Sequence, residues 1–499
     1  MQTSPDSKPT PRGEPDTLVG RIATDLRQQI ERGDLGPGDR LPTLRATALA
    51  HGVHPSTAQQ AYRQLQGEGL VSSQVGRGTV VLEPEVAQPQ STPQRPRGKF
   101  SPAARAALAA VDNARGWSLP NLADCEFDFL SLHPEPSLFP ADELKAAIDS
   151  ALDPSRTALG YGDPAGSPRL RQLLAERGGR RTEEVLVTSG AQQGIDLVVR
   201  ALVAPGEAVA VAVPTYPQLF GLLATQGVRA VPIESEDGIA DPESLREVTR
   251  RDDVRLVYVM PSFHNPTGHT LDLDERKRFF DVLADTEVPV LEDEYESDLR
   301  FRGEAPPTLA SLDPRGRTVT VRTVSKALFP GLRLGWLEAN ADLLSPMLAL
   351  KQFSDIETSG FLQEVLLLLL ERGALDEHLD RLREDLRRRH DLADRMLTDR
   401  LGEQLRWQSP EGGPMLWIRC DGLDAEQIAR RASEKGVAVL PNRVFDPEGL
   451  RPNAPSAIRL SVARTTDDRL ERGLQILCDC LESELEESQR KRAARPVIF

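Results

Sequence analysis

The sequence predicts a two-domain α/β protein with a small helical N-terminal module and a larger domain built on a mostly parallel sheet, which ends in a small C-terminal α+β subdomain. Three observations predict it. A chain of 499 residues is longer than one hydrophobic core usually supports. A segment rich in Pro and Gln divides the chain. After it, apolar strand-like runs alternate with amphipathic helices. We expect domains at 15–83 and 116–488, joined by a linker at 84–115.

The composition is that of a water-soluble globular protein, with 39% apolar and 27% charged residues. The longest apolar run, Val365–Leu370, is too short to span a bilayer. Residues 1–16 lack the apolar segment of a signal peptide. The four cysteines are scattered, without a zinc-type spacing. We therefore expect a cytoplasmic protein with reduced thiols, no membrane association and no metal site.

The net charge of −15 argues against a protein that coats nucleic acid, but the charge is unevenly distributed. Residues 17–82 carry seven basic and five acidic side chains, so the rest of the chain holds the whole negative excess. A mildly basic module on an acidic body can approach DNA with one face only.

The N-terminal module has the pattern of a winged helix-turn-helix. Leu18, Ile22, Leu26 and Ile30 form one apolar stripe that predicts a first helix, which ends at a Gly-Pro turn. A second helix is expected from Leu41 to about residue 51, and a third opens with Ser56 as its N-cap. Alternation around Gly76, Arg77 and Gly78 predicts a β-hairpin. This geometry places one helix in a major groove and a wing on the DNA backbone.

The run GDLGPGDRLPTLRATALAHGVHPSTAQQAYRQLQGEGLVSSQVGRGTVV resembles the GntR superfamily of DNA-binding regulators. The chain differs from this superfamily at Pro55 and Gln59, where members often carry arginines. The sequence therefore does not predict which operator the protein binds. A winged helix that binds protein or RNA remains the alternative. The resemblance implies contacts to operator DNA from Arg45, His54, Ser56, Thr57, Gln59 and Arg77.

Chemically suggestive motifs follow five predicted strands of the larger domain, where open α/β sheets bind ligands. Small residues in Ser189–Gly194 precede a helix and can expose backbone N–H groups to a phosphate. Pro214–Pro217 presents an aromatic ring, Pro261–Gly268 an amide, and Glu292–Asp298 a carboxylate with a tyrosine two residues later. Lys326 lies in the run TVSKALFPGLRLGW, where a buried lysine can form a Schiff base. Each motif taken alone also has an ordinary structural explanation: Tyr216 could simply pack, and Glu292 and Glu294 could be solvated charges.

Together and in this order, the motifs resemble the class I and II aminotransferases, which are fold type I enzymes that depend on pyridoxal 5'-phosphate. The resemblance implies that Lys326 is the Schiff-base lysine and that Asp293 pairs with the protonated pyridine nitrogen. Tyr295 and Asn265 would bond the ring hydroxyl, and Tyr216 would stack on the ring. The phosphate would be held by Ala191, Gln192, Thr323, Ser325 and Arg333. Arg459 matches the arginine that clamps a substrate carboxylate, with a structural ion pair as its rival.

A GntR-like module joined by a linker to an aminotransferase-like body resembles the MocR subfamily. That resemblance implies a head-to-tail homodimer that binds operator DNA and senses a small amine, an amino acid or pyridoxal phosphate itself through Schiff-base chemistry. The alternatives are a working aminotransferase with an appended DNA-binding domain, and a repressor that holds the cofactor only as a structural ligand. Gln218 after Pro217 offers no second cation for a distant carboxylate, so the effector stays open.

Overall fold

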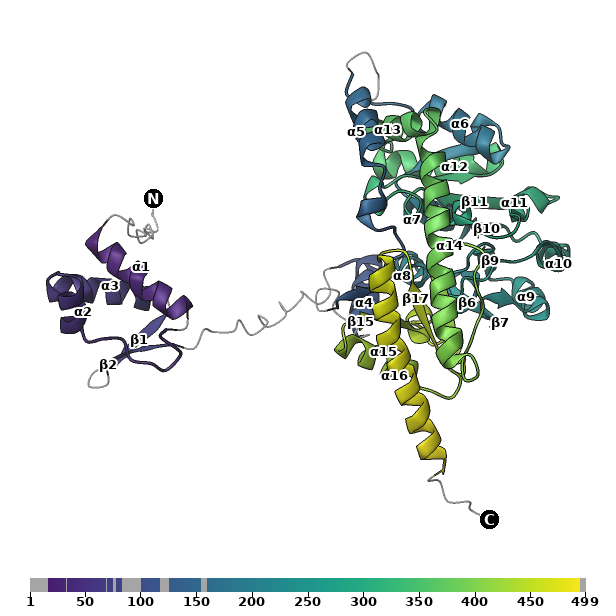
Figure 1. Ribbon diagram of the computed structural model, residues 1–499. Coiled ribbons are helices and arrows are strands. Elements are labelled where there is room, and N and C mark those ends of the chain that lie inside the picture. Colours follow the sequence, from purple (N-terminus) through teal and green to yellow (C-terminus); the bar gives the residue numbers. More distant parts are fainter. Residues whose placement is uncertain are drawn as a thin grey trace. The chain divides into compact units, whose positions relative to one another are not determined.

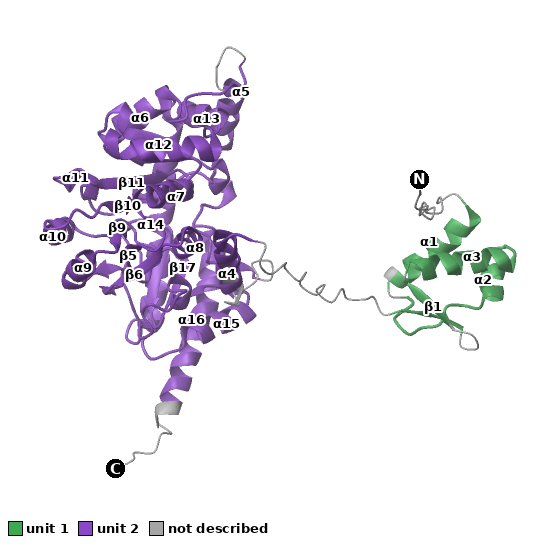
Figure 2. Cartoon of the chain, turned by 180° about the vertical axis from the view of Figure 1, so that it is seen from behind, with its two compact units in different colours: residues 1–99 green, residues 100–499 purple. Residues whose placement is uncertain are grey.

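The computed structural model describes residues 17–32, 34–68, 70–74, 78–82, 100–116, 125–153 and 159–493. The chain forms two compact units, residues 1–99 and residues 100–499 (Figure 2). Within the described ranges, no helix has the length and apolar character that crossing a membrane requires.

The first unit is a winged helix-turn-helix, as the sequence predicts. Its helices are α1 (Leu18–Glu31), α2 (Leu44–Ala50) and α3 (Pro55–Gly67). Strands β1 (Val71–Gln74) and β2 (Gly78–Val81) pair antiparallel to form the wing. One apolar cluster that includes buried side chains from α1, α3 and both strands holds the unit together.

Three details of this unit differ from the sequence expectation. Helix α2 begins at Leu44 and not at Leu41, with Thr43 as its N-cap. Leu18 does not share in the core, since it is 58% exposed at the first position of α1. Ser56 is not the N-cap of α3: the cap is His54, whose Nδ1 accepts from the Ser56 N–H at 3.4 Å. The reason is Pro55, which has no N–H to be capped and a φ suited to the first helical position, so the helix starts two residues earlier than expected.

The second unit is built on a seven-stranded sheet with strand order β4-β12-β11-β10-β9-β5-β6. Figure 1 labels β11, β10, β9 and β6 of this sheet. Neighbouring strands pair parallel except at β12, which runs antiparallel to both neighbours, so the sheet is mostly parallel, as predicted. The strands are β4 (Val185–Thr188), β5 (Ala208–Ala212), β6 (Arg229–Ile233), β9 (Val254–Val259), β10 (Val290–Asp293), β11 (Thr318–Thr323) and β12 (Gly335–Glu338).

Helices separate the strands along the chain, and apolar side chains of helices and sheet form the buried clusters of the unit. A short hairpin, β7 (Ser235–Glu236) and β8 (Ile239–Ala240), follows β6. The helices up to the C-terminal subdomain are α4 (Pro102–Gly116), α5 (Ala141–Ala151), α6 (Pro168–Gly178), α7 (Ala191–Leu202), α8 (Pro217–Gln226), α9 (Pro242–Thr249), α10 (Leu273–Leu283), α11 (Leu309–Leu312), α12 (Ala341–Asp355) and α13 (Gly360–Glu371).

Helix α4 lies in the stretch that we expected to be a linker. It belongs to the second unit and packs against α8, where a Cβ built on Gly221 would lie 3.5 Å from that of Ala110. Most of the apolar side chains of α4 are alanines, so the helix has few of the large apolar side chains that usually mark a buried helix. The second unit therefore begins at residue 100, before the boundary expected from the sequence.

The C-terminal subdomain is the expected α+β unit. The sheet, in the order β13-β14-β17-β16, has antiparallel neighbours, and β15 pairs parallel with β3, which comes from the start of the unit. The elements are β3 (Phe127–Asp128), α14 (Ala374–Leu401), β13 (Arg406–Trp407), β14 (Met415–Arg419), α15 (Ala425–Glu434), β15 (Val437–Ala438), β16 (Leu440–Pro441), β17 (Ala457–Ser461) and α16 (Asp467–Ala493).

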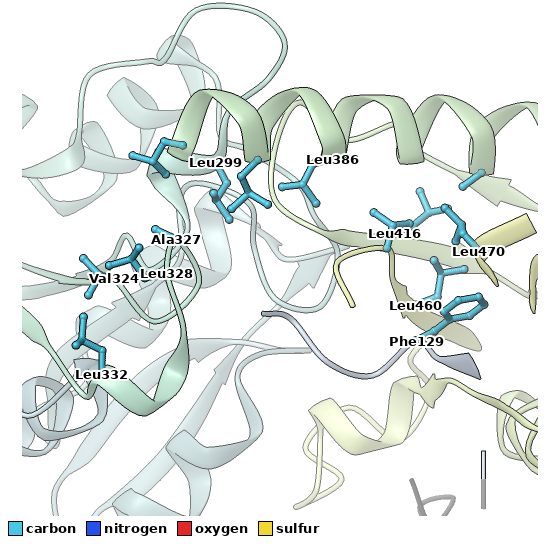
Figure 3. Close-up of a cluster of buried hydrophobic side chains, with 14 of the residues drawn as sticks. Phe129, Leu299, Val324, Ala327, Leu328, Leu332, Leu386, Leu416, Leu460 and Leu470 are labelled. Carbon is cyan, nitrogen blue, oxygen red and sulfur yellow. The ribbon is translucent and has the colours of Figure 1, made fainter. Parts of the chain in front are cut away.

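One apolar cluster connects this subdomain to the segment after β11 (Figure 3). Val324, Ala327 and Leu328 belong to it, together with Leu386 of α14 and Leu460 of β17. Residues on both sides of Lys326 are thus anchored in a core shared by the large sheet and the subdomain.

Candidate cofactor and ligand site

One cavity brings together all ten residues that the sequence predicts to hold a cofactor. It lies at the carboxyl ends of β4, β5, β9, β10 and β11, which come close together because these strands run in the same direction. Leu132, Ile195, Met260 and Pro330 complete its lining. The predicted residues are Ala191, Gln192, Tyr216, Asn265, Asp293, Tyr295, Thr323, Ser325, Lys326 and Arg333.

Asp293 ends β10 and is buried at the base of this cavity. The Tyr258 hydroxyl donates to its Oδ2 at 2.7 Å, while Oδ1 is buried and has no hydrogen-bond partner among the described residues. Burial raises the pKa of Asp293 to about 7, against the opposing effect of the Tyr258 hydroxyl. The Asp293 carboxyl group therefore has no cationic hydrogen-bond donor among the described residues. A protonated ring nitrogen would supply one.

Lys326 lies in the segment that follows β11 and lines the same cavity as Ala191 and Gln192 of α7. Burial lowers the pKa of its amine, and the carboxylates of Glu296 and Asp293 oppose that effect. The next residue is fixed from outside the cavity, since His378 Nε2 of α14 lies 2.8 Å from the Ala327 carbonyl oxygen. A lower pKa makes the lysine lose its proton more readily, and the neutral amine is the form that attacks an aldehyde.

An anion cup lies at the N-terminus of α7. Gly190 precedes the helix with φ +83°, and a Cβ built there would come within 2.8 Å of the Arg333 guanidinium. Arg333 itself has φ +50° and donates to the Ser189 carbonyl at 3.3 Å. Thr323 Oγ1 and Ser325 Oγ lie 2.9 Å apart on the same cavity. Free helix N–H groups, hydroxyls and a guanidinium together suit a phosphate group.

A buried network that the sequence analysis missed supports this cup. The Ser189 N–H donates to Gln193 Oε1 at 2.7 Å, and Gln193 Nε2 donates to Asp355 Oδ2 at 2.8 Å. Lys351, fully buried on α12, donates to Asp355 Oδ1 at 3.0 Å. The spacing of Lys351 and Asp355 reveals a helical ion pair, but nothing local indicates that it meets a loop far away in the sequence.

The aromatic and amide side chains at the cavity are held by their own hydrogen bonds. The Tyr216 hydroxyl donates to Gln192 Oε1 at 3.0 Å, and burial raises the Tyr216 pKa to about 12, so it stays protonated. The Tyr295 hydroxyl donates to the Phe263 carbonyl at 3.0 Å. Asn265 contacts Arg459, the residue predicted to bind a substrate carboxylate. The Asn265 Oδ1 accepts from Arg459 Nη1 at 3.4 Å.

Arg459 on β17 reaches the site from the C-terminal subdomain and is 4% exposed. Its Nη2 donates to the Leu130 carbonyl at 2.5 Å, and the guanidinium carbon lies 5.3 Å from the centre of the Phe445 ring. Burial lowers the pKa of Arg459 to about 10, so the side chain remains a cation at neutral pH. Nε is buried without a hydrogen-bond partner in the described part of the chain, and no carboxylate there lies within ion-pair distance of the guanidinium, which leaves it able to receive a carboxylate from a ligand.

The acidic residues around Asp293 are buried, so the structure excludes the interpretation of Glu292 and Glu294 as solvated charges. Glu292 accepts from the backbone N–H groups at the start of α11, at 2.6 and 3.1 Å. Glu294 accepts from the Ser262 hydroxyl at 2.9 Å and lies 3.6 Å from the Arg276 guanidinium. Glu296, which the sequence analysis did not single out, is buried beside the site. The acidic run EDEYESD was the sequence signal that could have identified Glu296. So many carboxylates rarely follow a buried strand unless they have partners within the protein.

In the first unit, the residues predicted to contact DNA lie on α2 and at the start of α3. Arg45, His54, Ser56 and Gln59 are exposed, and Thr57 is half-buried. His54 Nδ1 lies 2.8 Å from Ser56 Oγ, so these two polar groups form one local pair at the helix start. Arg77 lies outside the described residues.

Comparison with known proteins agrees with this division of the chain. Residues 18–81 match the family described as bacterial regulatory proteins, gntR family, and residues 130–477 match the family aminotransferase class I and II. The HTH-type transcriptional regulator TauR of Rhodobacter capsulatus is 32% identical over 89% of this chain and 96% of its own length. The HTH-type regulator YisV of Bacillus subtilis is 26% identical over 92% of this chain and 94% of its own length.

Solved aminotransferases share the fold of the second unit. LysN, the α-aminoadipate aminotransferase of Thermus thermophilus, has a TM-score of 0.70 at 30% identity and covers 78% of this chain and 98% of its own. It was solved with N-(5'-phosphopyridoxyl)-L-leucine. The kynurenine aminotransferase of Pyrococcus horikoshii has a TM-score of 0.68 at 27% identity, with the same coverage.

The fold and the site define a DNA-binding regulator joined to a pyridoxal-phosphate-type transferase domain. The chain belongs to the GntR-family regulators that carry a class I and II aminotransferase domain, the MocR-type architecture. Pyridoxal 5'-phosphate is the cofactor that this membership implies, and the unpartnered Asp293 oxygen, the lysine and the anion cup fit it.

Proposed function

We propose that this protein is a cytoplasmic transcription regulator whose second unit senses a small amine, an amino acid or pyridoxal phosphate itself and thereby changes operator binding by the first unit. The observation that carries the proposal is the presence, in one chain, of an exposed DNA-type helix face and of a site in which ten of the lining residues suit pyridoxal phosphate. The cofactor supplies a reactive aldehyde and an electron-withdrawing ring when it is bound.

The protein residues then have separate roles. Lys326 would anchor the cofactor covalently, and the unpartnered Oδ1 of Asp293 would accept from its protonated ring nitrogen. Arg459 would bind a ligand carboxylate, and Asn265, which it contacts, would bond the ring hydroxyl together with Tyr295. Tyr216 would stack on the ring. The residues that would hold the phosphate group are Ala191, Gln192, Thr323, Ser325 and Arg333.

A change in the bonding of the Lys326 amine would act on a segment whose neighbouring residues are buried in the protein core. Val324, Ala327 and Leu328 are buried in the cluster shared with α14 and the C-terminal subdomain (Figure 3). His378 adds a polar link from α14 to Ala327. A change at Lys326 can therefore shift the balance between two arrangements of the subdomain, provided that the ligand binds them with different affinity.

The second unit also presents an apolar surface that suits a homodimer. Phe353 is 93% exposed and Tyr161 is 86% exposed, and Leu159 and Ile356 are exposed as well. The segments that carry them meet, since the Gly162 N–H donates to Glu357 Oε2 at 2.5 Å. Large exposed apolar side chains gathered in one region mark an interaction site. We propose that a second copy of this chain covers them.

A genuine aminotransferase with an appended DNA-binding domain is the second candidate. The complete cofactor-type cavity and the similarity to LysN favour it. Both candidates predict a site loaded with cofactor, so the cofactor alone does not distinguish them.

The test of the proposal is a screen of amines and amino acids against the purified, cofactor-loaded protein, read by visible absorption. A sensor should respond to a small subset, and borohydride should fix the cofactor onto Lys326 in their absence. Lys326→Ala should fold, take up the cofactor without covalent attachment and fail to trap it. A colourless wild-type protein that does not take up added pyridoxal phosphate would contradict the proposal.

A further inference from the structure

Helices α5 and α14 border another cavity, apart from the one that Lys326 lines. Its volume is about 360 Å³, and it shares no lining residue with the cofactor cavity. One wall is the segment 137–143, which runs into the first turn of α5. The other wall is one face of α14, formed by His378, Arg381 and Leu382. None of the roles assigned above makes use of this space.

His378 is a buried polar residue in the wall of this cavity, with 1% exposure. Its Nε2 lies 2.8 Å from the Ala327 carbonyl oxygen, and because a carbonyl oxygen only accepts, Nε2 carries a proton. Nδ1 is buried and has no hydrogen-bond partner among the described residues. Burial lowers the pKa of His378, and Arg381 acts in the same direction, against the Ala327 hydrogen bond and Glu143. The neutral ring therefore keeps a lone pair on Nδ1, which only a hydrogen-bond donor satisfies.

The charges around the cavity favour a donor that is also a cation. Its lining holds the carboxylates of Asp142 and Glu143 against the guanidinium of Arg381. Both carboxylates lie in the first turn of α5, so they offset the positive end of that helix and make it a poor site for an anion. Within the described ranges, no group of three histidine, cysteine or carboxylate side chains could hold a metal ion, which points to an organic cation.

The apolar part of the lining suits a short hydrocarbon chain. It consists of Leu138, Phe139, Pro140 and Leu382. Ligand sites in proteins typically combine such apolar walls with a few polar groups that fix the orientation of the ligand. A protonated alkylamine brings the N–H donor, the positive charge and the apolar surface that these walls match.

We propose that the cavity between α5 and α14 binds a small alkylammonium ion, which donates an N–H to His378 Nδ1 and has Glu143 as its counter-charge. A donor at Nδ1 polarises the ring and strengthens the Nε2–H bond to Ala327, the residue after Lys326. Ala327 is buried in the core that α14 shares with the C-terminal subdomain. The cavity is thus a place outside the cofactor site at which an amine acts on the Lys326 segment. Its effect on DNA binding rests on the proposed function, but its occupancy does not.

The probe is N,N-dimethylbutylammonium, which keeps one N–H donor but, as a tertiary amine, cannot take the place of the Lys326 amine on the cofactor. Calorimetry and saturation-transfer NMR on the cofactor-loaded full chain measure its binding, with an expected Kd of about 1 mM for a ligand of this size. His378→Gln retains an N–H donor for Ala327 and loses the Nδ1 acceptor, so it should bind the probe about tenfold more weakly or worse. Glu143→Gln removes the counter-charge and should weaken binding as well.

Two matched variants are the controls. Glu377→Gln removes the exposed carboxylate one residue before His378, and Asp149→Asn removes one from the exposed ion pair with Lys145 on α5. Neither residue lines the cavity, so both variants should bind the probe as wild type does.

Equal affinity in wild type and His378→Gln would overturn the inference, as would a probe that does not saturate the wild type below about 10 mM. If His378→Gln does not fold, Arg381→Gln decides. Removing this exposed guanidinium from the cavity wall should tighten binding of a cation, and unchanged or weaker binding would refute the site. These measurements involve neither DNA nor turnover, so the inference can fail while the proposed function stands, and the reverse.

Discussion

Tyr258 and Asp293 form a buried pair in which the tyrosine hydroxyl donates to Oδ2 at 2.7 Å and leaves Oδ1 unpartnered in the cavity. The pair fixes the carboxyl group of Asp293 without using its second oxygen. Because burial also raises the Asp293 pKa to about 7, the site gains most from a ligand that brings a positive charge to this oxygen. This relationship is the physical basis for the proposed cofactor site.

Asp293→Asn should weaken binding of pyridoxal phosphate without unfolding the chain. The variant keeps the shape of the side chain but loses a hydrogen bond to a charged group, roughly 1.5–3 kcal/mol, or about 10- to 150-fold in Kd. Fluorescence titration of the cofactor-free protein measures it. Asp281→Asn, an exposed carboxylate on α10, is the control and should bind as wild type does. Equal affinity of Asp293→Asn and wild type would show that Asp293 does not contribute to cofactor binding.

The stability of the cofactor-free protein should fall as pH rises from about 6.5 to about 7.5. Burial raises the pKa of Asp293 and of Glu292 to about 7, so the folded chain retains protons that the unfolded chain has already released above about pH 4.5. Stability is therefore lost as pH rises through these folded-state values. His264 and His390, with pKa values lowered by burial to about 3 and 4, change stability in the opposite direction only below about pH 6.5.

Urea unfolding followed at several pH values measures this dependence. Glu292→Gln should flatten the fall, and bound pyridoxal phosphate should flatten it further, since its ring nitrogen would neutralise Asp293. Stability that rises over the same pH range in the cofactor-free protein would show that the two carboxyl groups are not the controlling ones.

The DNA-binding prediction concerns the exposed face of α2 and α3. Residues 1–85 should bind a promoter fragment near the protein's own gene, with affinity that falls steeply as salt rises. Arg45→Ala should weaken binding, by about 1–3 kcal/mol if Arg45 reads a base. Arg21→Ala, an exposed arginine on α1, is the matched control. Full affinity in an Arg45→Ala, Arg77→Ala double variant would mean that another face binds DNA.

Arg459→Ala should abolish the response to amines that carry a carboxylate and leave the cofactor bound. The guanidinium contacts Asn265 and Leu130 and none of the cup residues, so its loss removes the ligand clamp and not the phosphate site. Visible-absorption titration with the effector measures the response, and Arg464→Ala, partly exposed nearby on the chain, is the control. If pyridoxal phosphate itself is the effector, Arg459→Ala should respond normally.

The large sheet and the wing were predictable from sequence because buried parallel strands give continuous apolar runs and a glycine-tipped hairpin alternates. The cavity residues were predictable because parallel strands bring their carboxyl ends to one edge. The residues that support the cavity were not predictable. Tyr258 contacts Asp293, Lys351 contacts Asp355 and His378 contacts Ala327, and no local sequence pattern reveals these contacts. Helix α4 was not predicted for a related reason: composition alone did not separate its alanine-rich sequence from the proline-rich stretch before it.

The central claim, that the protein is a sensor and not a committed transferase, is tested most directly by titrating promoter binding with each amine beside a transamination assay on the same preparation. The account predicts that one amine, or pyridoxal phosphate, changes promoter occupancy at concentrations where turnover is negligible. Turnover in the ordinary enzyme range of about 1–1,000 per second, with DNA binding indifferent to every amine and to the cofactor, would contradict it.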